Sequence, residues 1–111
     1  MKVVVVGYGS IGKRHVTNLT SLGVTEIVLC RSSTKGNELN LKEVTELEEI
    51  IKICPDFVIV SNPTSLHFQT LKFLVQHQFN ILCEKPFLLK PEEWETAKKY
   101  GLECAVATDS F

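Results

Sequence analysis

The sequence has no surplus of charge of either sign and no long apolar run. It carries 12 Lys and Arg residues against 13 Asp and Glu residues, which gives a formal net charge of −1. A general nucleic-acid binder needs a basic surplus, so that class is excluded. The apolar run Val3–Val6 is far shorter than the about 20 residues of a membrane span or the roughly 7 to 15 of a signal-peptide core. We therefore expect a cytoplasmic protein without nucleic-acid or membrane partners.

Cysteine is scarce, and its spacing excludes the usual metal motifs. The four cysteines, Cys30, Cys54, Cys83 and Cys104, form no CxxC pair and have no histidine nearby at a metal-ligand spacing. We therefore expect no metal site. Because free cysteines are among the residues most often found inside proteins, we expect buried, reduced thiols, and a disulfide has no support.

Short apolar runs alternate along the chain with segments of helical periodicity. The runs predict strands over residues 2–6, 27–30, 57–61, 80–84 and 103–108, with at most a short further strand over 41–44. Apolar spacing and terminal signals predict helices over 10–22, 45–53, 65–77 and 91–100. The polar interval 31–40 is predicted as a loop. Strands that alternate with helices indicate βαβ units and one α/β domain over residues 1–111, with a doubly wound parallel sheet of about six strands and helices on both faces.

Three glycines stand between the first predicted strand and the first predicted helix. Gly7, Gly9 and Gly12 have the spacing GxGxxG. In this context Gly7 allows a tight turn, Gly9 lets the backbone approach a pyrophosphate, and Gly12 lets the helix pack close to the sheet. The amides and dipole at the helix start then attract the anion. The pattern predicts a Rossmann-type dinucleotide-binding fold. The alternative is that the glycines serve packing or another nucleotide-like ligand.

The end of the second strand lacks the acidic residue that normally receives the adenosine ribose of NAD. That place is occupied by Arg31, Ser32, Ser33 and Thr34. A missing carboxylate weakens the preference for NAD, and a nearby cation attracts a phosphate. We therefore predict NADP as the preferred cofactor over NAD, with Arg31 as the cation and the hydroxyl residues as donors. The alternative is that Arg31 and Lys35 are solvated loop charges.

Two further polar segments follow later strands. One contains Asn62, Pro63 and His67, and the other contains Glu84 and Lys85. Taken alone, the first segment is an ordinary helix-entry turn and the second an ordinary loop. The carboxyl ends of parallel strands, however, meet at the edge where open α/β sheets bind ligands. We therefore expect both segments to lie near the glycine turn.

The combination of GxGxxGxxH, N-P-x-x-x-H and E-K-P resembles the Gfo/Idh/MocA family of NAD(P)-dependent oxidoreductases, and the resemblance covers essentially the whole chain. Members act on sugars, polyols and their derivatives. The resemblance implies that the pyrophosphate is cradled by Gly7, Tyr8, Gly9, Ser10, Ile11 and Gly12. It also implies that Asn62, Pro63 and His67 line the cofactor towards its nicotinamide end, while Glu84 and Lys85 reach the nicotinamide ribose and the substrate.

Lys85 is the candidate catalytic residue. A hydride leaves a carbinol carbon only when the hydroxyl also loses a proton. The Lys85 ammonium is suited to hold that oxygen, stabilise its developing charge or relay the proton. The nicotinamide cofactor supplies the hydride chemistry.

The family pattern includes a C-terminal substrate domain, which we expect to be absent from this chain. The resemblance thus implies the nucleotide-binding domain of an oxidoreductase that transfers a hydride to or from a sugar, polyol or related compound, and we expect this domain alone not to be catalytically complete. A stand-alone NADP-binding sensor or regulatory module is the alternative. An enzyme of another class, such as a methyltransferase, is disfavoured because Cys30 and Arg31 stand where an acidic residue is expected. An open sheet edge leaves a homo-oligomer possible in principle.

Overall fold

A parallel sheet with helices on both of its faces forms the described part of the chain. The computed structural model describes residues 1–32, 34 and 36–83. The strands are β1 (Lys2–Val6), β2 (Glu26–Cys30), β3 (Lys42–Val44), β4 (Phe57–Val60) and β5 (Ile81–Cys83). The helices are α1 (Ser10–Ser21), α2 (Glu48–Ile53) and α3 (Thr64–Gln76). The predicted α/β class is confirmed.

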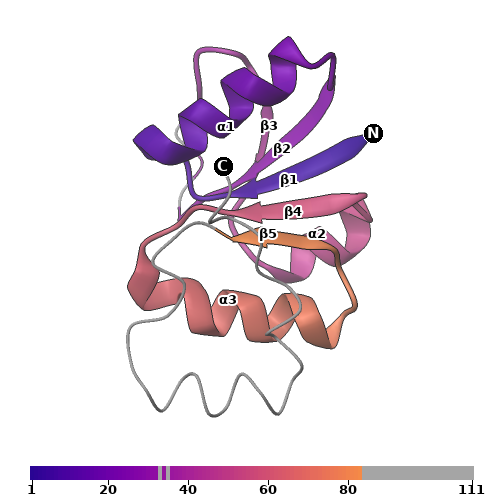
Figure 1. Cartoon of the computed structure of the whole chain (residues 1–111). Coiled ribbons are helices and arrows are strands. Elements are labelled where there is room, and N and C mark those ends of the chain that lie inside the picture. The colour runs from indigo at the N-terminus through magenta and orange to yellow at the C-terminus, as the bar shows by residue number, and fades with distance from the viewer. Residues whose placement is uncertain (33, 35, 84–111) are drawn as a thin grey trace.

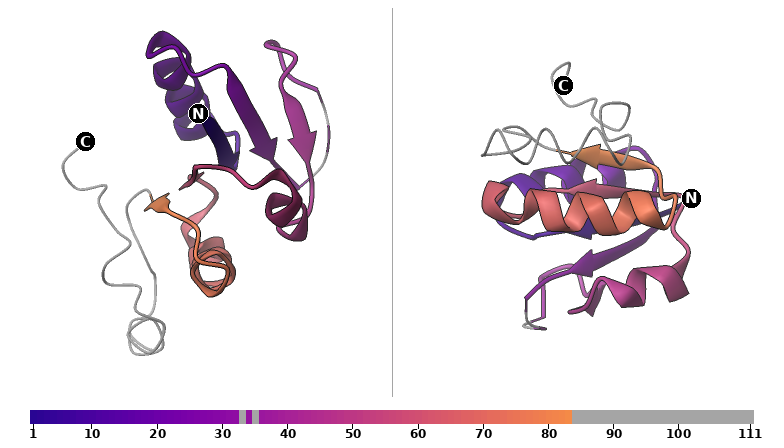
Figure 2. Two further views of the ribbon diagram at one scale, coloured as in Figure 1. Left: turned by 90° about the vertical axis from the view of Figure 1, so that its right-hand side faces the viewer. Right: turned by 90° about the horizontal axis from the view of Figure 1, so that it is seen from below.

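The five described strands have the order β3-β2-β1-β4-β5, and every neighbouring pair is parallel. Figure 1 shows the sheet between α1 on one side and α3 on the other. Figure 2 shows α2 and α3 together on the side opposite α1. The sheet is therefore doubly wound, as predicted. The sixth strand and fourth helix of the prediction lie outside the described residues.

The four valines of β1 form the centre of the core. Val3 and Val5 belong to the cluster that packs against α1, whereas Val4 and Val6 belong to the cluster that packs against α2 and α3. Each is at most 4% exposed. Burial of a valine side chain stabilises the fold by about 1.5 kcal/mol or more, and an apolar run is stable only when both faces are covered. This two-sided burial is the reason that β1 is a continuous run rather than an alternating one.

The helix ends follow the sequence signals only in part. At the end of α1, Gly23 has φ of +90°, and Val24 N–H donates to the Leu19 carbonyl at 3.0 Å. This is the Schellman ending expected for a terminal glycine. The predicted capping box between Thr45 and Glu48 is wrong. The carboxylate of Glu49 instead accepts the backbone N–H groups before α2, because the helix begins three residues after Thr45.

The predicted loop over residues 31–40 is confirmed. No helix joins β2 to β3 within the described residues of this interval. The connection is held by Asn37, whose side-chain nitrogen donates to the Leu41 carbonyl at 2.9 Å and whose oxygen accepts the Leu41 N–H at 2.8 Å. β2 is therefore connected to β3 by a loop that the hydrogen bonds of Asn37 hold in place.

The cysteine prediction is confirmed at two positions and wrong at one. Cys30 and Cys83 are buried, but Cys54 is exposed. Cys54 ends α2 in the left-handed conformation, and its thiol donates to the Ile51 carbonyl at 3.2 Å. Cys104 lies outside the described residues. Among the described side chains, no group of three or more His, Cys, Asp and Glu residues could hold a metal ion. No described helix is long and apolar enough to cross a bilayer.

The strand order reverses between β1 and β4. From β1 the chain proceeds outwards through β2 to β3, then returns to β4 on the other side of β1 and continues to β5. In open α/β sheets the crevice outside the carboxyl ends of the strands at such a reversal is the usual ligand site. The glycine turn follows β1, and Asn62 follows β4, so both stand at this point.

Candidate functional site

A cleft of about 520 Å³ opens at the carboxyl ends of the strands. It brings together seven of the predicted site residues: Gly7, Tyr8, Gly9, Arg31, Ser32, Asn62 and Pro63. Three other predicted residues, Ser33, Glu84 and Lys85, lie outside the described residues. We refer to this cavity as the carboxyl-edge cleft.

The three glycines of the turn differ in what surrounds them. Gly7 has φ of +91°, and a Cβ there would lie 2.6 Å from the backbone nitrogen of Asn62. A Cβ on Gly12 would collide with the carbonyl oxygen of Gly7. At Gly9, by contrast, a Cβ would meet no heavy atom within 4 Å in the described part of the chain. Packing therefore explains Gly7 and Gly12 but leaves Gly9 unexplained, and Gly9 lines the cleft.

The first turn of α1 supplies backbone donors beside Gly9. Gly9 is the N-cap, and its carbonyl accepts the first helical bond from Lys13 at 2.9 Å. No side chain of the described residues caps this end. The amides of Ser10, Ile11 and Gly12 therefore have no partner within the helix. Such a terminus favours an anion, and the space beside Gly9 lets it approach.

Asn62, which also lines the cleft, carries a side-chain acceptor without a partner among the described residues. Its side-chain nitrogen donates to the Thr70 hydroxyl at 3.1 Å. Its Oδ1 is buried and has no hydrogen-bond partner among the described residues. Buried polar atoms are normally satisfied, so this oxygen is suited to accept a donor from a bound ligand. A ribose hydroxyl or a carboxamide NH₂ has the required chemistry.

His67 lies beneath the cleft rather than in its lining. It is 1% exposed, and its Nε2 is 2.8 Å from the carbonyl oxygen of Asn62. Its Nδ1 is 3.6 Å from the Cys83 sulfur. In the structure His67 therefore holds the backbone of Asn62, and its predicted contact with the cofactor stays a prediction.

Arg31 is a fixed side chain at the rim of the cleft. Its Nη1 donates to a Glu43 carboxylate oxygen at 3.2 Å and to the Gly36 carbonyl at 3.1 Å. The guanidinium carbon lies 5.2 Å from the centre of the Tyr8 ring. The interpretation of Arg31 as a solvated loop charge is therefore wrong. Lys35, the other residue of that interpretation, lies outside the described residues, while Thr34 is exposed and does not line the cleft.

Tyr8 is buried at the turn instead of projecting from it. Its ring lies near both Lys13 and Arg31, and its hydroxyl donates to Glu38 at 2.9 Å. Burial and the Glu38 carboxylate raise the pKa of Tyr8. The pKa of Glu38 is lowered by its backbone hydrogen bond and by the Tyr8 hydroxyl. At neutral pH the pair is a neutral phenol and an ionised carboxylate, which fastens the loop over residues 31–40 to the glycine turn.

The sequence analysis missed several residues of the lining. These are Thr45, Leu47, Leu66, Gln69 and Thr70. Leu66, Gln69 and Thr70 have the spacing of one helix face, which was the available signal once α3 was known to begin at the cleft. Leu66 is 45% exposed and presents an apolar side chain to the cleft. Apolar walls of this kind are suited to the flat face of a nucleobase.

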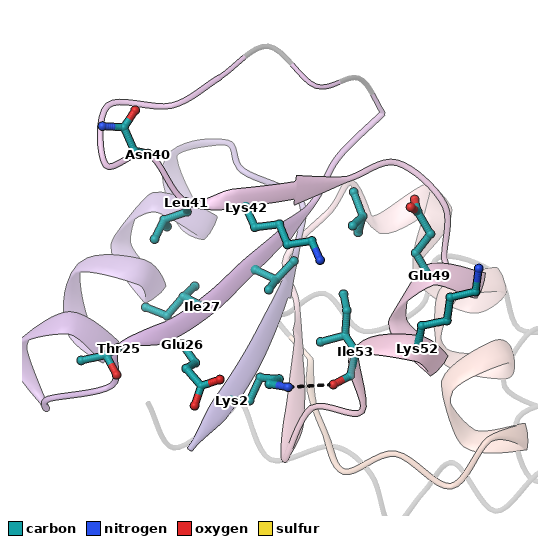
Figure 3. A pocket seen from close by; sticks show the side chains of 12 residues that line it. Lys2, Thr25, Glu26, Ile27, Asn40, Leu41, Lys42, Glu49, Lys52 and Ile53 are labelled. Carbon is teal, nitrogen blue, oxygen red and sulfur yellow. Dashed lines mark hydrogen bonds between the residues drawn. The ribbon is translucent and has the colours of Figure 1, made fainter.

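A second cavity, of about 540 Å³, lies at the opposite edge of the sheet. Figure 3 shows Lys2, Lys42 and Lys52 around it, together with Glu26 and Glu49. The Lys2 ammonium donates to the Ile53 carbonyl at 3.1 Å. None of the predicted site residues lines this cavity, and its charges are mixed. The geometry therefore favours the carboxyl-edge cleft as the functional site.

Comparison with known proteins points to an NAD-binding fold. A family model described as an oxidoreductase family with an NAD-binding Rossmann fold matches residues 1–107. YrbE of Bacillus subtilis (strain 168), an uncharacterized oxidoreductase, is 25% identical over an alignment of 114 positions that covers 92% of this chain and 33% of YrbE.

Solved structures have the same fold. The oxidoreductase yvaA of Bacillus subtilis is 31% identical with a TM-score of 0.75, and the match covers 96% of this chain and 34% of yvaA. Scyllo-inositol dehydrogenase from Lactobacillus casei, solved with NAD(H) and scyllo-inositol, is 21% identical with a TM-score of 0.79. That match covers 98% of this chain and 36% of the dehydrogenase.

The chain thus spans about a third of the length of these relatives. The matched part is the segment that contains the glycine turn, Arg31 and Asn62. Because the family model extends over residues 1–107, the chain belongs to the Gfo/Idh/MocA oxidoreductase family and forms its NAD-binding Rossmann domain.

Proposed function

We propose that this domain binds NAD(H) or NADP(H) in the carboxyl-edge cleft and serves hydride transfer to or from a sugar, polyol or related hydroxyl compound. The observation that carries the cofactor part is the open space beside Gly9 at the uncapped start of α1. Packing accounts for the other two glycines of the motif but not for this one. The substrate class is supported by the scyllo-inositol dehydrogenase, whose structure holds NAD(H) and scyllo-inositol.

The lining residues fit the parts of a nicotinamide dinucleotide. Gly9 and the amides of the first turn of α1 would hold the diphosphate. Arg31 and Ser32 stand where the adenosine ribose is bound after the second strand of such sheets. Leu66 offers an apolar wall for the adenine. Asn62 would accept a hydrogen bond from the nicotinamide half, and the bound cofactor would supply the hydride chemistry.

The preference between the two nucleotides depends on Arg31. Its position in the lining beside Ser32 supports NADP. Its ion pair with Glu43, however, reduces the attraction that the guanidinium exerts on a phosphate. We propose that the domain accepts both nucleotides, with a weaker preference for NADP than the sequence alone predicts.

Lys85 is proposed as the residue that holds or relays the proton of the substrate hydroxyl, and Glu84 as its neighbour at the nicotinamide ribose. In any longer form of the enzyme, replacing Lys85 with alanine should lower kcat far more than it weakens cofactor affinity. Steady-state kinetics and a cofactor titration on the same variant measure the two effects. Equal losses would make Lys85 a binding residue only.

A calorimetric titration of the chain with NAD⁺ and with NADP⁺ tests the cofactor site. We expect the chain to bind both nucleotides, and Gly9→Val to abolish binding while the chain stays folded, because the side chain fills the space for the diphosphate. Ser21→Val, at the other end of α1, is the control and should bind as the wild type does. Binding that survives Gly9→Val, or no binding by the wild type, would contradict the proposal.

A further inference from the structure

A buried carboxylate stands behind the arginine of the cleft. Glu43 lies on β3, where it pairs with Leu29 of β2 on the face covered by α1. Its side chain is 5% exposed, against 20% for Arg31. Glu43 is not among the residues that line the cleft. The carboxylate therefore acts on the cleft through Arg31.

Glu43 is held by groups that fix its position. One of its oxygens accepts a hydrogen bond from Arg31 at 3.2 Å and another from the Asn37 side chain at 2.7 Å. The backbone on either side is also fixed, because the Arg31 N–H donates to the carbonyl of Val44 at 2.9 Å. The ion pair is therefore built into the junction of β2 and β3.

This arrangement changes what Arg31 does to a phosphate. An ionised carboxylate is tolerated at such low exposure only when it is paired and hydrogen-bonded. A phosphate on the cleft side of Arg31 would be attracted by the guanidinium and repelled by the carboxylate directly behind it. The uncharged ribose hydroxyls of NAD experience no comparable repulsion. Glu43 therefore weakens the binding of NADP relative to NAD.

We propose that Glu43 is a cofactor-specificity residue that acts through Arg31. By offsetting the charge of Arg31, it lets the site accept NAD as well as NADP. This inference rests on the proposed dinucleotide function, because it concerns the adenosine end of the same cleft.

The test is a calorimetric titration of Glu43→Gln with NAD⁺ and NADP⁺. Glutamine keeps an oxygen that accepts from Arg31 but removes the negative charge. We expect the ratio of the NAD⁺ dissociation constant to the NADP⁺ dissociation constant to rise about tenfold or more. Glu26→Gln is the matched control, because it removes the same charge at the amino end of β2. It should leave the ratio unchanged.

The outcomes separate the two hypotheses. An unchanged or lower ratio in Glu43→Gln, with both nucleotides still bound, overturns the specificity role and leaves the dinucleotide function standing. Failure of the wild type to bind either nucleotide overturns both. If Glu43→Gln does not fold, the ratio of the NAD⁺ and NADP⁺ dissociation constants of the wild type tests the inference instead. An NADP preference of about a hundredfold or more is what an uncompensated arginine would give, and it would overturn the inference.

Discussion

The Nε2 atom of His67 lies 2.8 Å from the carbonyl oxygen of Asn62, beneath the floor of the cleft. A carbonyl oxygen only accepts hydrogen bonds, so Nε2 carries a proton. Nδ1 lies 3.6 Å from the sulfur of Cys83. The buried imidazole thus links the turn after β4 to the end of β5.

Replacing His67 with phenylalanine should lower the free energy of unfolding by about 1 to 3 kcal/mol, because the buried carbonyl of Asn62 loses its donor. It should also weaken cofactor binding, since Asn62 lines the cleft. His67→Gln places an amide nitrogen near the position of Nε2 and should lose less on both measures. Urea denaturation and nucleotide titration supply the data. Equal losses in the two variants would show that this hydrogen bond is not the cause.

Replacing Gly12 with alanine should destabilise the fold, because the new Cβ would collide with the carbonyl oxygen of Gly7. Overpacking of this kind costs about 1 to 3 kcal/mol. Gly9→Ala, in the same motif, should cost no more than about 1 kcal/mol, because open space surrounds that position and only the preference of the N-cap for glycine over alanine is lost. Thermal unfolding followed by circular dichroism measures both. A similar loss in the two variants would contradict the separate roles of these glycines.

Replacing Arg31 with alanine should cost about 3 to 5 kcal/mol of stability, because the buried carboxylate of Glu43 loses its charged partner. The same change in a Glu43→Gln background should cost much less, since no charge is then stranded. The double-mutant cycle therefore predicts a large coupling between the two sites. Additive losses, measured by urea denaturation of the four proteins, would show that the ion pair contributes nothing of its own.

Cys30 should make the fold sensitive to alkali. Burial, together with smaller contributions from the carboxylates of Glu49, Glu46 and Glu48, raises the pKa of its thiol from 9.0 to about 11. The folded state therefore keeps the proton at a pH at which the unfolded chain releases it. The stability that depends on this proton is complete below about pH 9 and falls as the pH rises towards 11.

The loss between pH 9 and 11 should be smaller in Cys30→Ala than in the wild type, as measured by urea denaturation at several pH values. Peptide-level mass spectrometry after alkylation of the native protein at neutral pH should find Cys54 modified before Cys30. Equal alkali sensitivity in the two proteins would show that Cys30 is not the group responsible.

Much of the fold was predictable because burial leaves a direct mark on the sequence. A run such as Val3–Val6 has one stable environment, a strand covered on both faces, and the glycine turn after it marks the ligand edge. The cleft followed from the same logic, since Asn62 stands at the end of another such run. These inferences needed only local patterns and the rule that parallel strands end at one edge.

The ion pair that sets the charge at the rim of the cleft could not be predicted from the sequence in the same way. Glu43 lies twelve residues from Arg31, in a strand of three residues whose register the sequence does not reveal. The polar interval between them left solvated loop charges as an alternative for Arg31, but Tyr8, Asn37 and Glu43 hold the described part of this interval against the sheet. The hydrogen bond between His67 and the Asn62 carbonyl was not predictable for a similar reason, because a histidine near a ligand edge is equally suited to line a ligand and to fasten the backbone beneath it.

The close fit of Gly7 against the backbone of Asn62 has a kinetic consequence. The turns after β1 and β4 meet at that contact, so the base of the cleft is already assembled when a ligand arrives. Little of the chain then has to become ordered when the nucleotide binds. This preorganisation increases affinity because it lowers the entropic cost of binding. Association should follow one rate proportional to nucleotide concentration, with no slower rearrangement after the collision.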